Sequence, residues 1–273
     1  MTTKEEWLQQ RRAHLTATDM VNILRLTPWS SPWKVWAEKT SVEYDNTVGI
    51  AARLGTAMEP TLAALAETEL GLGPIDLVGY NLQTHPDNDT WAATIDGWTQ
   101  EGDIVEFKTH GLTSKPTLTH EWANGLPLAV EVQVRWQLLV TGAPRAHVVA
   151  LVGGLGLIHR VIEADDEWNY ELSIIAALWW KKHIEEGQTP ALTIGDPPPA
   201  ITRLGTSTTH TAANALAGSY RHHREEERKA NEKKKLAGLH IRTAMNGADR
   251  LVDAAGYTAA SIDKRGTLRV PNQ

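Results

Sequence analysis

The chain has 273 residues and no cysteine, so disulfide bonds and metal sites built on thiolates are excluded. With 27 basic and 33 acidic residues its net charge is −6, which argues mildly against a protein coated with nucleic acid, although a local basic groove can lie on an acidic body. No apolar run approaches the ~20 residues of a membrane-spanning helix, and the polar N-terminus lacks a signal-peptide core. We therefore expect a cytoplasmic protein with no membrane partner.

The first third of the chain is predicted to be mainly helical. Residues 5–26 are expected to form helices, with Thr18 or Asp19 capping the segment 20–24. A turn over 29–33 precedes a short helix that begins near Trp33. The next helix is expected over 55–70, because Pro60 is tolerated only in the first turn of a helix.

The middle of the chain alternates strands with helices, which predicts an α/β fold: a mixed sheet flanked by helices. Residues 90–94 and 103–109 are expected to pair as antiparallel strands. The remaining elements are a strand over 77–84, a helix over 128–140 ended by Gly142, strands over 146–153 and 156–163, and a helix over 167–186.

Composition divides the chain near residue 195. All eleven Trp residues lie at or before Trp180, so the last ninety residues can form only a thin core. We predict a first domain over 1–194, a Pro-rich linker over 195–210 and a C-terminal extension over 211–273. The extension is expected to contain a charged helix over 211–236 and a small β meander over 250–270. Such a helix is usually a solvated face or an assembly arm, and DNA contact is a minority alternative.

The triplet Glu106-Phe107-Lys108 is the centre of the candidate site. In a strand, side chains at i and i+2 point to the same face, so Glu106 and Lys108 should project together while Phe107 enters the core. Asp96 lies ten residues upstream, at a predicted strand end, and Gly97 after it allows a ligand to approach the backbone. Two carboxylates that hold a hard cation, beside a lysine, suit metal-assisted phosphodiester cleavage.

Each candidate also has an ordinary structural interpretation. Asp96 suits a turn, and Glu106 with Lys108 suits an exposed ion pair on a strand. Glu59 lies near the start of the predicted helix, where the helix dipole favours a carboxylate. Gln133 and Gln137 share one helix face and can simply be hydrogen-bonded in the core. The ordered combination carries more weight than any one residue.

Taken in order, these motifs resemble the YqaJ-type viral recombinase nucleases, relatives of phage lambda exonuclease in the PD-(D/E)XK nuclease superfamily. The resemblance runs along most of residues 11–190. Its segments are Thr16-Ala17-Thr18-Asp19, Gly55 with Glu59-Pro60, residues 93–97, the Glu-x-Lys strand over 102–109, residues 122–127 followed by Gln133, and residues 186–190. The resemblance implies a restriction-endonuclease-like core with a C-terminal helical and small β extension.

The resemblance also implies a role for each site residue. Asp96, Glu106, Glu59 and the backbone carbonyl of Phe107 would hold Mg²⁺, with Mn²⁺ able to substitute. Lys108 would orient the attacking water or stabilise charge on the phosphate, and Gln133 would support it. The 5′ phosphate of DNA would be bound by Arg11 or Arg12 with Thr18. Independently of the resemblance, most of the eleven tryptophans are expected to pack in the core or in an interface, and one or two, such as Trp29 or Trp33, could stack on a DNA end.

The implied function is an ATP-independent 5′-to-3′ exonuclease that degrades linear double-stranded DNA for phage-type recombination in a bacterial host. It implies a homo-oligomeric ring, such as a trimer, and a single-strand annealing protein as partner. The absence of a GxxxxGK[ST] loop fits this interpretation. The alternatives are a DNA endonuclease or helicase-associated nuclease of the same superfamily, and a non-catalytic DNA-end-binding protein.

Overall fold

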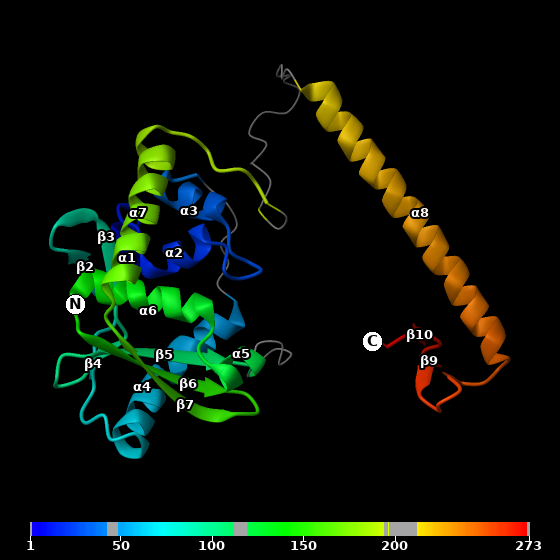
Figure 1. Ribbon diagram of the computed structural model, residues 1–273, viewed down its shortest axis with the longest axis horizontal. Helices are drawn as coiled ribbons and strands as arrows, with labels where there is room; N and C mark the ends of the chain where they lie inside the picture. The colour runs from blue at the N-terminus through cyan, green and yellow to red at the C-terminus, as the bar shows by residue number, and fades with distance from the viewer. Residues whose placement is uncertain (1, 43–48, 112–118, 194–195, 197–211, 272–273) are drawn as a thin grey trace. The chain divides into compact units, whose positions relative to one another are not determined.

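The computed structural model describes residues 2–42, 49–111, 119–193, 196 and 212–271. Contacts divide the chain into two compact units, residues 1–201 and residues 202–273, which are described separately below (Figure 1). The linker expected over 195–210 lies outside the described residues except for Asp196. Among the described helices, none combines the length and the apolar content that a membrane crossing requires.

A five-stranded mixed sheet forms the centre of the first unit (Figure 1). In sheet order its strands are β1 (Asp76–Leu77), β4 (Gly97–Trp98), β5 (Ile104–His110), β6 (Arg145–Val152) and β7 (Gly156–Glu163). β5 and β6 run parallel, with Glu106 opposite Val148, and the other neighbouring pairs are antiparallel. The predicted mixed sheet is confirmed.

Helices cover both faces of this sheet because the side chains of a strand alternate between its faces. On one face, Ile104 and Val148 join a core shared with α2, α6 and α7. On the other face, Val105 and Phe107 pack against Leu62 of α4. The helices of this unit are α1 (Lys4–Arg12), α2 (Ala17–Ile23), α3 (Pro32–Lys39), α4 (Ile50–Glu69), α5 (Thr119–Asn124), α6 (Leu128–Thr141), α7 (Asp166–Trp180) and the π-helix η1 (Lys181–Glu185).

The strand that precedes the site pairs differently from the prediction. β3 (Asn88–Thr94) pairs with β2 (Leu82–His85) in a separate two-stranded sheet, so the expected pairing of residues 90–94 with 103–109 is wrong. The chain leaves β3 before Asp96, and β4 is the antiparallel neighbour of β5. The single strand predicted over 77–84 is also interrupted, because Gly79 adopts a left-handed conformation with φ of 66°.

α4 begins earlier than predicted. It starts at Ile50, so Pro60 lies in its interior and not in its first turn. Ala51 and Ala52 have high helix propensity and extend the helix towards the N-terminus. The cost is one unmade backbone hydrogen bond, because Pro60 has no N–H to donate. The stabilising effect of the dipole is confined to the first turn of a helix, so it does not explain a carboxylate at Glu59.

The cap of α2 also differs from the prediction. The helix begins at Ala17, and Thr16 is its N-cap residue. The backbone N–H and the hydroxyl of Thr16 donate to Asp19 Oδ2 at 2.9 and 2.8 Å. Thr18 therefore lies inside the first turn, where its side chain is exposed, and it does not cap the helix.

The two long helices beside the sheet follow the sequence closely. α6 ends at Gly142, which has a left-handed φ of 70° and donates its N–H to the carbonyl of Leu138. The helix predicted over 167–186 is present as α7, which continues directly into η1. Both predictions are confirmed, apart from the change of helix type at Lys181.

The second unit consists of one long helix and a small sheet. α8 (Ala213–Met245) extends nine residues beyond the predicted end at Leu236. β8 (Arg250–Val252), β9 (Thr258–Ile262) and β10 (Leu268–Arg269) form the predicted antiparallel meander. Its buried hydrophobic residues are Met245 and Ala260, which fits the expectation of a thin core.

Candidate active site

Glu106 and Lys108 project from the same face of β5, as predicted. The Lys108 ammonium donates to Glu106 Oε1 in a short contact. Phe107 turns to the opposite face and packs in the core against α4. The pair differs from an exposed ion pair on a strand, since Glu106 is only 1% exposed. A carboxylate buried this deeply needs several donors to remain charged.

Two glutamines of α6 supply those donors. Gln133 Nε2 donates to Glu106 Oε1 and Gln137 Nε2 donates to Glu106 Oε2, both at 2.6 Å. Gln137 also donates to the carbonyl of Thr94 at 3.1 Å. The structure thus brings Gln133 to the site and adds Gln137, which was not predicted as a site residue. The signal for Gln137 was its position one helical turn after Gln133.

Asp96 directly precedes β4, beside the part of β5 that β4 does not pair with. Its Oδ2 accepts a hydrogen bond from the Phe107 N–H at 2.9 Å. The N–H and C=O of a strand residue point to the same side of the strand, so the Phe107 carbonyl faces this edge too. Asp96 and that carbonyl therefore lie on the same side of β5, which is the arrangement that a shared ligand requires.

Gly97 has a packing role that the sequence did not indicate. A Cβ at this position would lie 2.8 Å from Ile75 Cγ2 and 3.3 Å from the carbonyl oxygen of Asp76. The glycine thus admits the segment that leads into β1. The space beside Gly97 is filled by this segment and not left open for a ligand, contrary to the expectation from the sequence.

Glu59 faces the same site from the middle of α4. Burial and the charge of Glu106 raise its pKa, against a hydrogen bond from Thr56 and the charge of Lys108. The pKa of Asp96 is raised well above its ordinary value, first by burial and then by Glu106. These effects show that Asp96, Glu106 and Glu59 share one electrostatic environment.

Lys108 balances only part of this negative charge. Burial lowers its pKa, but the charges of Glu106 and Asp96 outweigh that effect and raise it overall. Three carboxyl groups and a backbone carbonyl form an oxygen donor set of the kind that binds Mg²⁺ or Mn²⁺. As the side chains stand, Glu106 is turned towards Lys108 and the glutamines, and the described residues contain no cluster of three acidic or histidine side chains around one point. The donor types and the charge fit a divalent cation.

Arg11 and Arg12 line a pocket of about 570 Å³ together with two cations that the sequence did not single out, Lys4 and Arg53. Thr56 of α4 lines it as well, and Glu59 follows one helical turn later. The basic pocket therefore adjoins the carboxylates. Thr18 is not among the residues that line it, so the structure does not bring Thr18 together with the two arginines there.

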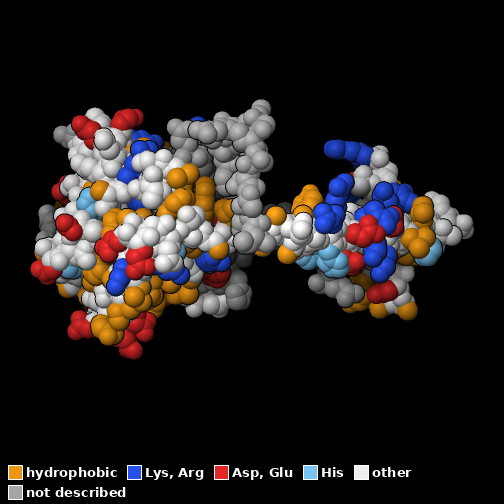
Figure 2. Space-filling model, turned by 90° about the horizontal axis from the view of Figure 1, so that it is seen from above, with side chains coloured by type: hydrophobic (Ala, Val, Ile, Leu, Met, Phe, Trp, Pro, Cys, Tyr) orange, Lys and Arg blue, Asp and Glu red, His pale blue; other side chains and the backbone are white. Residues whose placement is uncertain are grey.

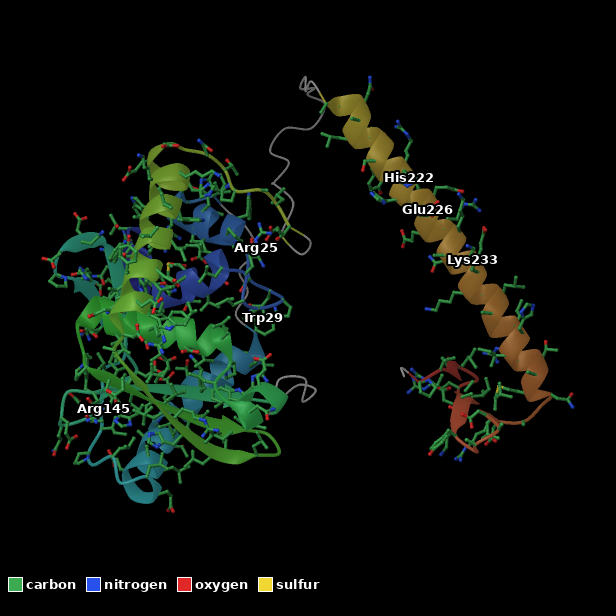
Figure 3. All side chains as sticks on the ribbon, in the orientation of Figure 1. Arg25, Trp29, Arg145, His222, Glu226 and Lys233 are labelled. Carbon is green, nitrogen blue, oxygen red and sulfur yellow. The ribbon has the colours of Figure 1, made fainter. Side chains whose placement is uncertain are left out.

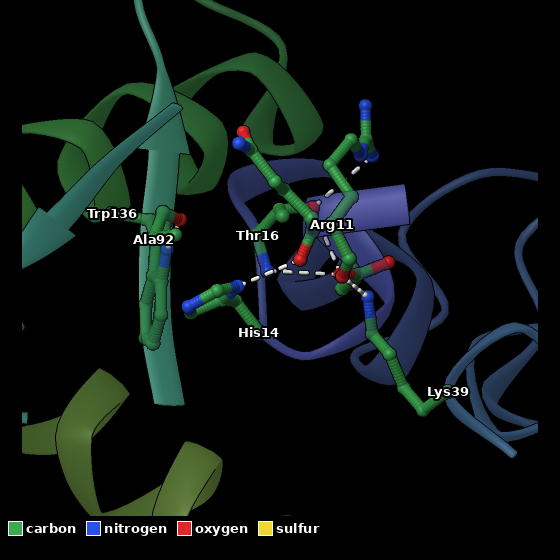
Figure 4. Close-up of polar contacts among 8 residues, drawn as sticks. Arg11, His14, Thr16, Lys39, Ala92 and Trp136 are labelled. Carbon is green, nitrogen blue, oxygen red and sulfur yellow. Dashed lines mark hydrogen bonds and ion pairs between the residues drawn. The ribbon is translucent and has the colours of Figure 1, made fainter. Parts of the chain in front are cut away.

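A buried ion pair fixes the backbone beneath Arg11 (Figure 4). Lys39 Nζ lies 2.7 Å from Asp19 Oδ2, with side-chain exposures of 1% and 2%, and donates to the Arg11 carbonyl at 2.8 Å. The Arg11 guanidinium donates to Thr16 Oγ1 at 3.2 Å and lies 4.7 Å from the centre of the Trp7 ring. Burial raises the pKa of Asp19, but Lys39 and Arg11 outweigh it and lower the pKa overall.

The two tryptophans proposed for DNA stacking differ in exposure. Trp33 is 4% exposed and belongs to the core, so it cannot offer a face to a base. Trp29, between α2 and α3, is 65% exposed (Figure 3). Only Trp29 of this pair is accessible for stacking.

The site segment matches a known family. A sequence model described as the YqaJ-like viral recombinase domain matches residues 6–144, which include every predicted site residue. The chain belongs to this family. It is 30% identical over 195 residues to the uncharacterized protein YqaJ of Bacillus subtilis (strain 168), across 70% of this chain. The chain spans only 59% of that relative's length.

Two solved structures share the fold. The alkaline exonuclease LHK-Exo from Laribacter hongkongensis is 20% identical, with a TM-score of 0.53 over 67% of this chain and 94% of the enzyme. LHK-Exo in complex with dAMP is 21% identical, with a TM-score of 0.54 over the same shares. At this identity the likeness establishes the fold alone, a mixed α/β sheet flanked by helices, as the sequence predicted.

Proposed function

We propose that this protein is a metal-dependent, ATP-independent deoxyribonuclease that degrades linear double-stranded DNA from its 5′ ends in homologous recombination. The observation that carries this proposal is the buried carboxylate of Glu106, held by Lys108, Gln133 and Gln137 beside Asp96. Family membership supports the recombination role. The shared fold supports the placement of a hydrolytic site at this edge of the sheet.

Asp96, Glu106, Glu59 and the Phe107 carbonyl are the residues that would hold Mg²⁺ or Mn²⁺. A bound divalent cation supplies Lewis-acid stabilisation of the phosphate and of the leaving 3′ oxygen. Gln133 and Gln137 fix the orientation of the Glu106 carboxylate from the other face of the site. The pKa of Asp96 is raised first by burial and then by the charge of Glu106, so the positive charge of a bound cation would favour its ionised form.

Lys108 is best suited to stabilise charge. Its raised pKa favours the ammonium form in the metal-free protein, and an ammonium donates hydrogen bonds but cannot accept a proton. The side chain is 26% exposed, so it reaches both Glu106 and the open side of the site. We propose that it acts on the attacking water or on a phosphate oxygen.

The pocket beside Thr56 is the proposed site of the DNA 5′ phosphate. Arg11 and Arg12 remain the proposed ligands, and Arg53 and Lys4 add positive charge to the same pocket. Arginine binds phosphate through several directed N–H donors. Thr18 is kept as a proposed contact only for DNA that extends beyond the pocket, since its side chain is exposed on α2.

A homo-oligomeric ring and a single-strand annealing partner complete the proposal. Their support is membership of the recombinase family. Sedimentation velocity at micromolar concentration measures the assembly, and a strictly monomeric protein would overturn the ring. Co-sedimentation with a purified single-strand annealing protein measures the partnership.

Cleavage of linear duplex DNA in Mg²⁺ tests the central proposal. The substrate carries a 5′ phosphate and a different label on each strand, and a covalently closed circle is incubated in parallel. Asp96→Ala and Lys108→Ala are the site variants, and Glu171→Ala, an exposed position on α7, is the matched control. We expect loss from the 5′ ends and an intact circle for the wild type and the control, and no cleavage by the site variants.

The other outcomes are equally specific. A cut circle would replace the exonuclease proposal with an endonuclease. Tight DNA binding without turnover in Mg²⁺ or Mn²⁺ would replace it with a non-catalytic end-binding protein. Cleavage that persists in Asp96→Ala and Lys108→Ala would move the active site elsewhere.

A further inference from the structure

The basic and acidic residues are divided unevenly between the two units. Residues 1–201 carry 14 Lys and Arg against 26 Asp and Glu, a net charge of −12. Residues 202–273 carry 13 against 7, a net charge of +6. Figure 2 shows Lys and Arg side chains gathered on the second unit, with a smaller number of acidic ones among them. The C-terminal unit is therefore basic although the net charge of the whole chain is negative.

Five of these cations form a stripe along α8. Arg221, Arg224, Arg228, Lys235 and Arg242 are separated by three, four, seven and seven residues. At about 100° per residue this spacing places all five within a sector of about 60°, along about 31 Å of helix. All five side chains are exposed. We call this set the basic stripe.

Among the described residues, three members of the basic stripe have no ion-pair partner. Arg228 pairs with Glu225 and Glu232, and Arg242 donates to the Gly266 carbonyl at 2.9 Å. For Arg221, Arg224 and Lys235, no carboxylate lies within 4.0 Å in the described part of the chain. Their charges remain accessible to an external anion. Figure 3 shows side chains projecting freely along the length of the helix.

The stripe does not suit a coiled coil with a second copy of the chain. A coiled coil needs apolar residues at every third and fourth position. Between Arg221 and Lys235, Ala230 is the one apolar residue. The larger exposed apolar residues, Leu216, Tyr220, Leu236 and Leu239, lie outside this central segment. Two copies of a basic stripe would also repel each other.

We propose that the basic stripe binds the phosphate backbone of duplex DNA, away from the ends. This inference builds on the proposed nuclease function, because it assigns the C-terminal unit to the same substrate. A stripe of about 31 Å is close to the length of one turn of B-form DNA, so its cations can contact several phosphates. Contacts of this kind carry no sequence information and depend on counterion release. The arm would keep the protein on DNA between cleavage events.

The test measures binding of the full chain to a duplex whose two ends are closed by hairpin loops. The hairpin loops remove the DNA ends, and EDTA, present throughout, prevents cleavage. Arg221→Gln/Arg224→Gln/Lys235→Gln removes the three unpaired cations of the stripe. Lys229→Gln/Lys233→Gln/Lys234→Gln removes the same charge from other faces of α8 and is the matched control. Circular dichroism establishes that both variants keep their helix content.

We expect the stripe variant to bind at least about tenfold more weakly in low salt. The slope of log affinity against log salt should fall in magnitude by about 2–3, close to one for each phosphate that the variant no longer neutralises. The control should keep most of the wild-type slope. Wild-type affinity in the stripe variant, or an equally weakened affinity in both variants, would overturn the proposal. The proposal would also be overturned if the wild type and the control formed a dimer, the stripe variant did not, and all three bound DNA equally.

Cleavage of a short linear duplex in Mg²⁺, measured on the same proteins, separates this inference from the proposed function. A wild type that binds through the stripe but never cleaves would refute the nuclease and leave the stripe intact. An active wild type whose stripe variant binds closed duplex normally would refute the stripe alone.

Discussion

Lysine and arginine stand beside acidic residues in both units of this protein, but the surroundings differ. In the first unit, the side chains of Lys39 and Asp19 are 1% and 2% exposed. In the second, Arg228 and Glu225 form a similar pair at 2.6 Å with exposures of 58% and 45%. The distances alone would rank the two pairs as equals. Burial decides what each pair contributes.

A buried charge is costly to remove from water, so it depends on its partners, whereas water can solvate an exposed charge when a partner is removed. The first unit therefore uses its charges to hold fixed geometry, at Asp19 beneath Arg11 and at Glu106 in the candidate site. The second unit keeps its charges available to an external partner. The predictions below test this difference, from the largest expected effect to the smallest.

Lys39→Met should be the most destabilising change. It leaves Asp19 buried without its main partner, which typically costs about 3–5 kcal/mol of unfolding free energy. Arg228→Met breaks two exposed pairs and should change stability little. Urea denaturation followed by far-UV circular dichroism, which reports the helices of both units, measures both. Equal losses of stability in the two variants would contradict the distinction between buried and exposed pairs.

The dependence of stability on pH in the acid range tests the Asp19–Lys39 pair in a second way. The pKa of Asp19 is lowered, since Lys39 and Arg11 outweigh burial. Its contribution is therefore fully present above the ordinary value of 3.8 and is lost as the pH falls through the lowered value. The stability difference between the wild type and Asp19→Asn should shrink between pH 6 and pH 3. A stability difference that grows as the pH falls would mean that folding raises the pKa of Asp19 instead of lowering it.

Lys108→Met should reduce cleavage by about 10²–10³-fold, the usual effect of removing one group that stabilises developing charge. Lys181→Met, an exposed change in η1, is the matched control. Single-turnover rates on linear duplex at saturating Mg²⁺ measure the chemical step. If Lys108 instead acts as a general base, the residual rate of Lys108→Met should lose the pH dependence of the wild type.

Gln137→Leu, compared with Gln133→Leu, should show which of the two glutamines that donate to Glu106 contributes more to stability. Gln137 is 0% exposed, so its removal leaves Glu106 Oε2 without a donor, at a cost of about 1–3 kcal/mol. Gln133 is partly exposed, and water can replace its donor in Gln133→Leu. Thermal unfolding in EDTA should show the larger destabilisation for Gln137→Leu. The reverse order would mean that Gln133 carries the support of Glu106.

Local patterns in the sequence were enough to predict which side chains lie together at the centre of the candidate site. The strict alternation of β5 placed Glu106 and Lys108 on one face, and helical spacing placed Gln133 and Gln137 together. The sequence could not show that Gln137 lies opposite Glu106, because that contact joins elements 31 residues apart. The spacing of residues along a helix predicts which side chains share a face, but it does not predict which residues of other elements that face contacts.

Pairing and packing between distant segments explain most of the remaining errors. The antiparallel partner of β5 is a two-residue strand that leaves almost no pattern, so the longer segment before it was chosen instead. Pro60 was given too much weight against the alanines that precede it in α4. Arg53 was missed because only the fold brings it to the pocket of Arg11 and Arg12. The errors at β5 and Arg53 concern tertiary contacts, whereas the error at Pro60 concerns two competing local propensities.

The smallest expected effect decides between two adjacent arginines. Arg11 is held by Thr16, by the Trp7 ring and by the Lys39 clamp on its carbonyl, whereas Arg12 is exposed. A side chain that is already ordered loses less entropy on binding, so Arg11 should be the main ligand of the 5′ phosphate. The ratio of cleavage rates for 5′-phosphorylated and 5′-hydroxyl duplexes should fall about tenfold in Arg11→Gln and much less in Arg12→Gln. A larger fall in Arg12→Gln would assign the phosphate to the exposed arginine, and the buried Asp19–Lys39 pair would then serve the fold alone.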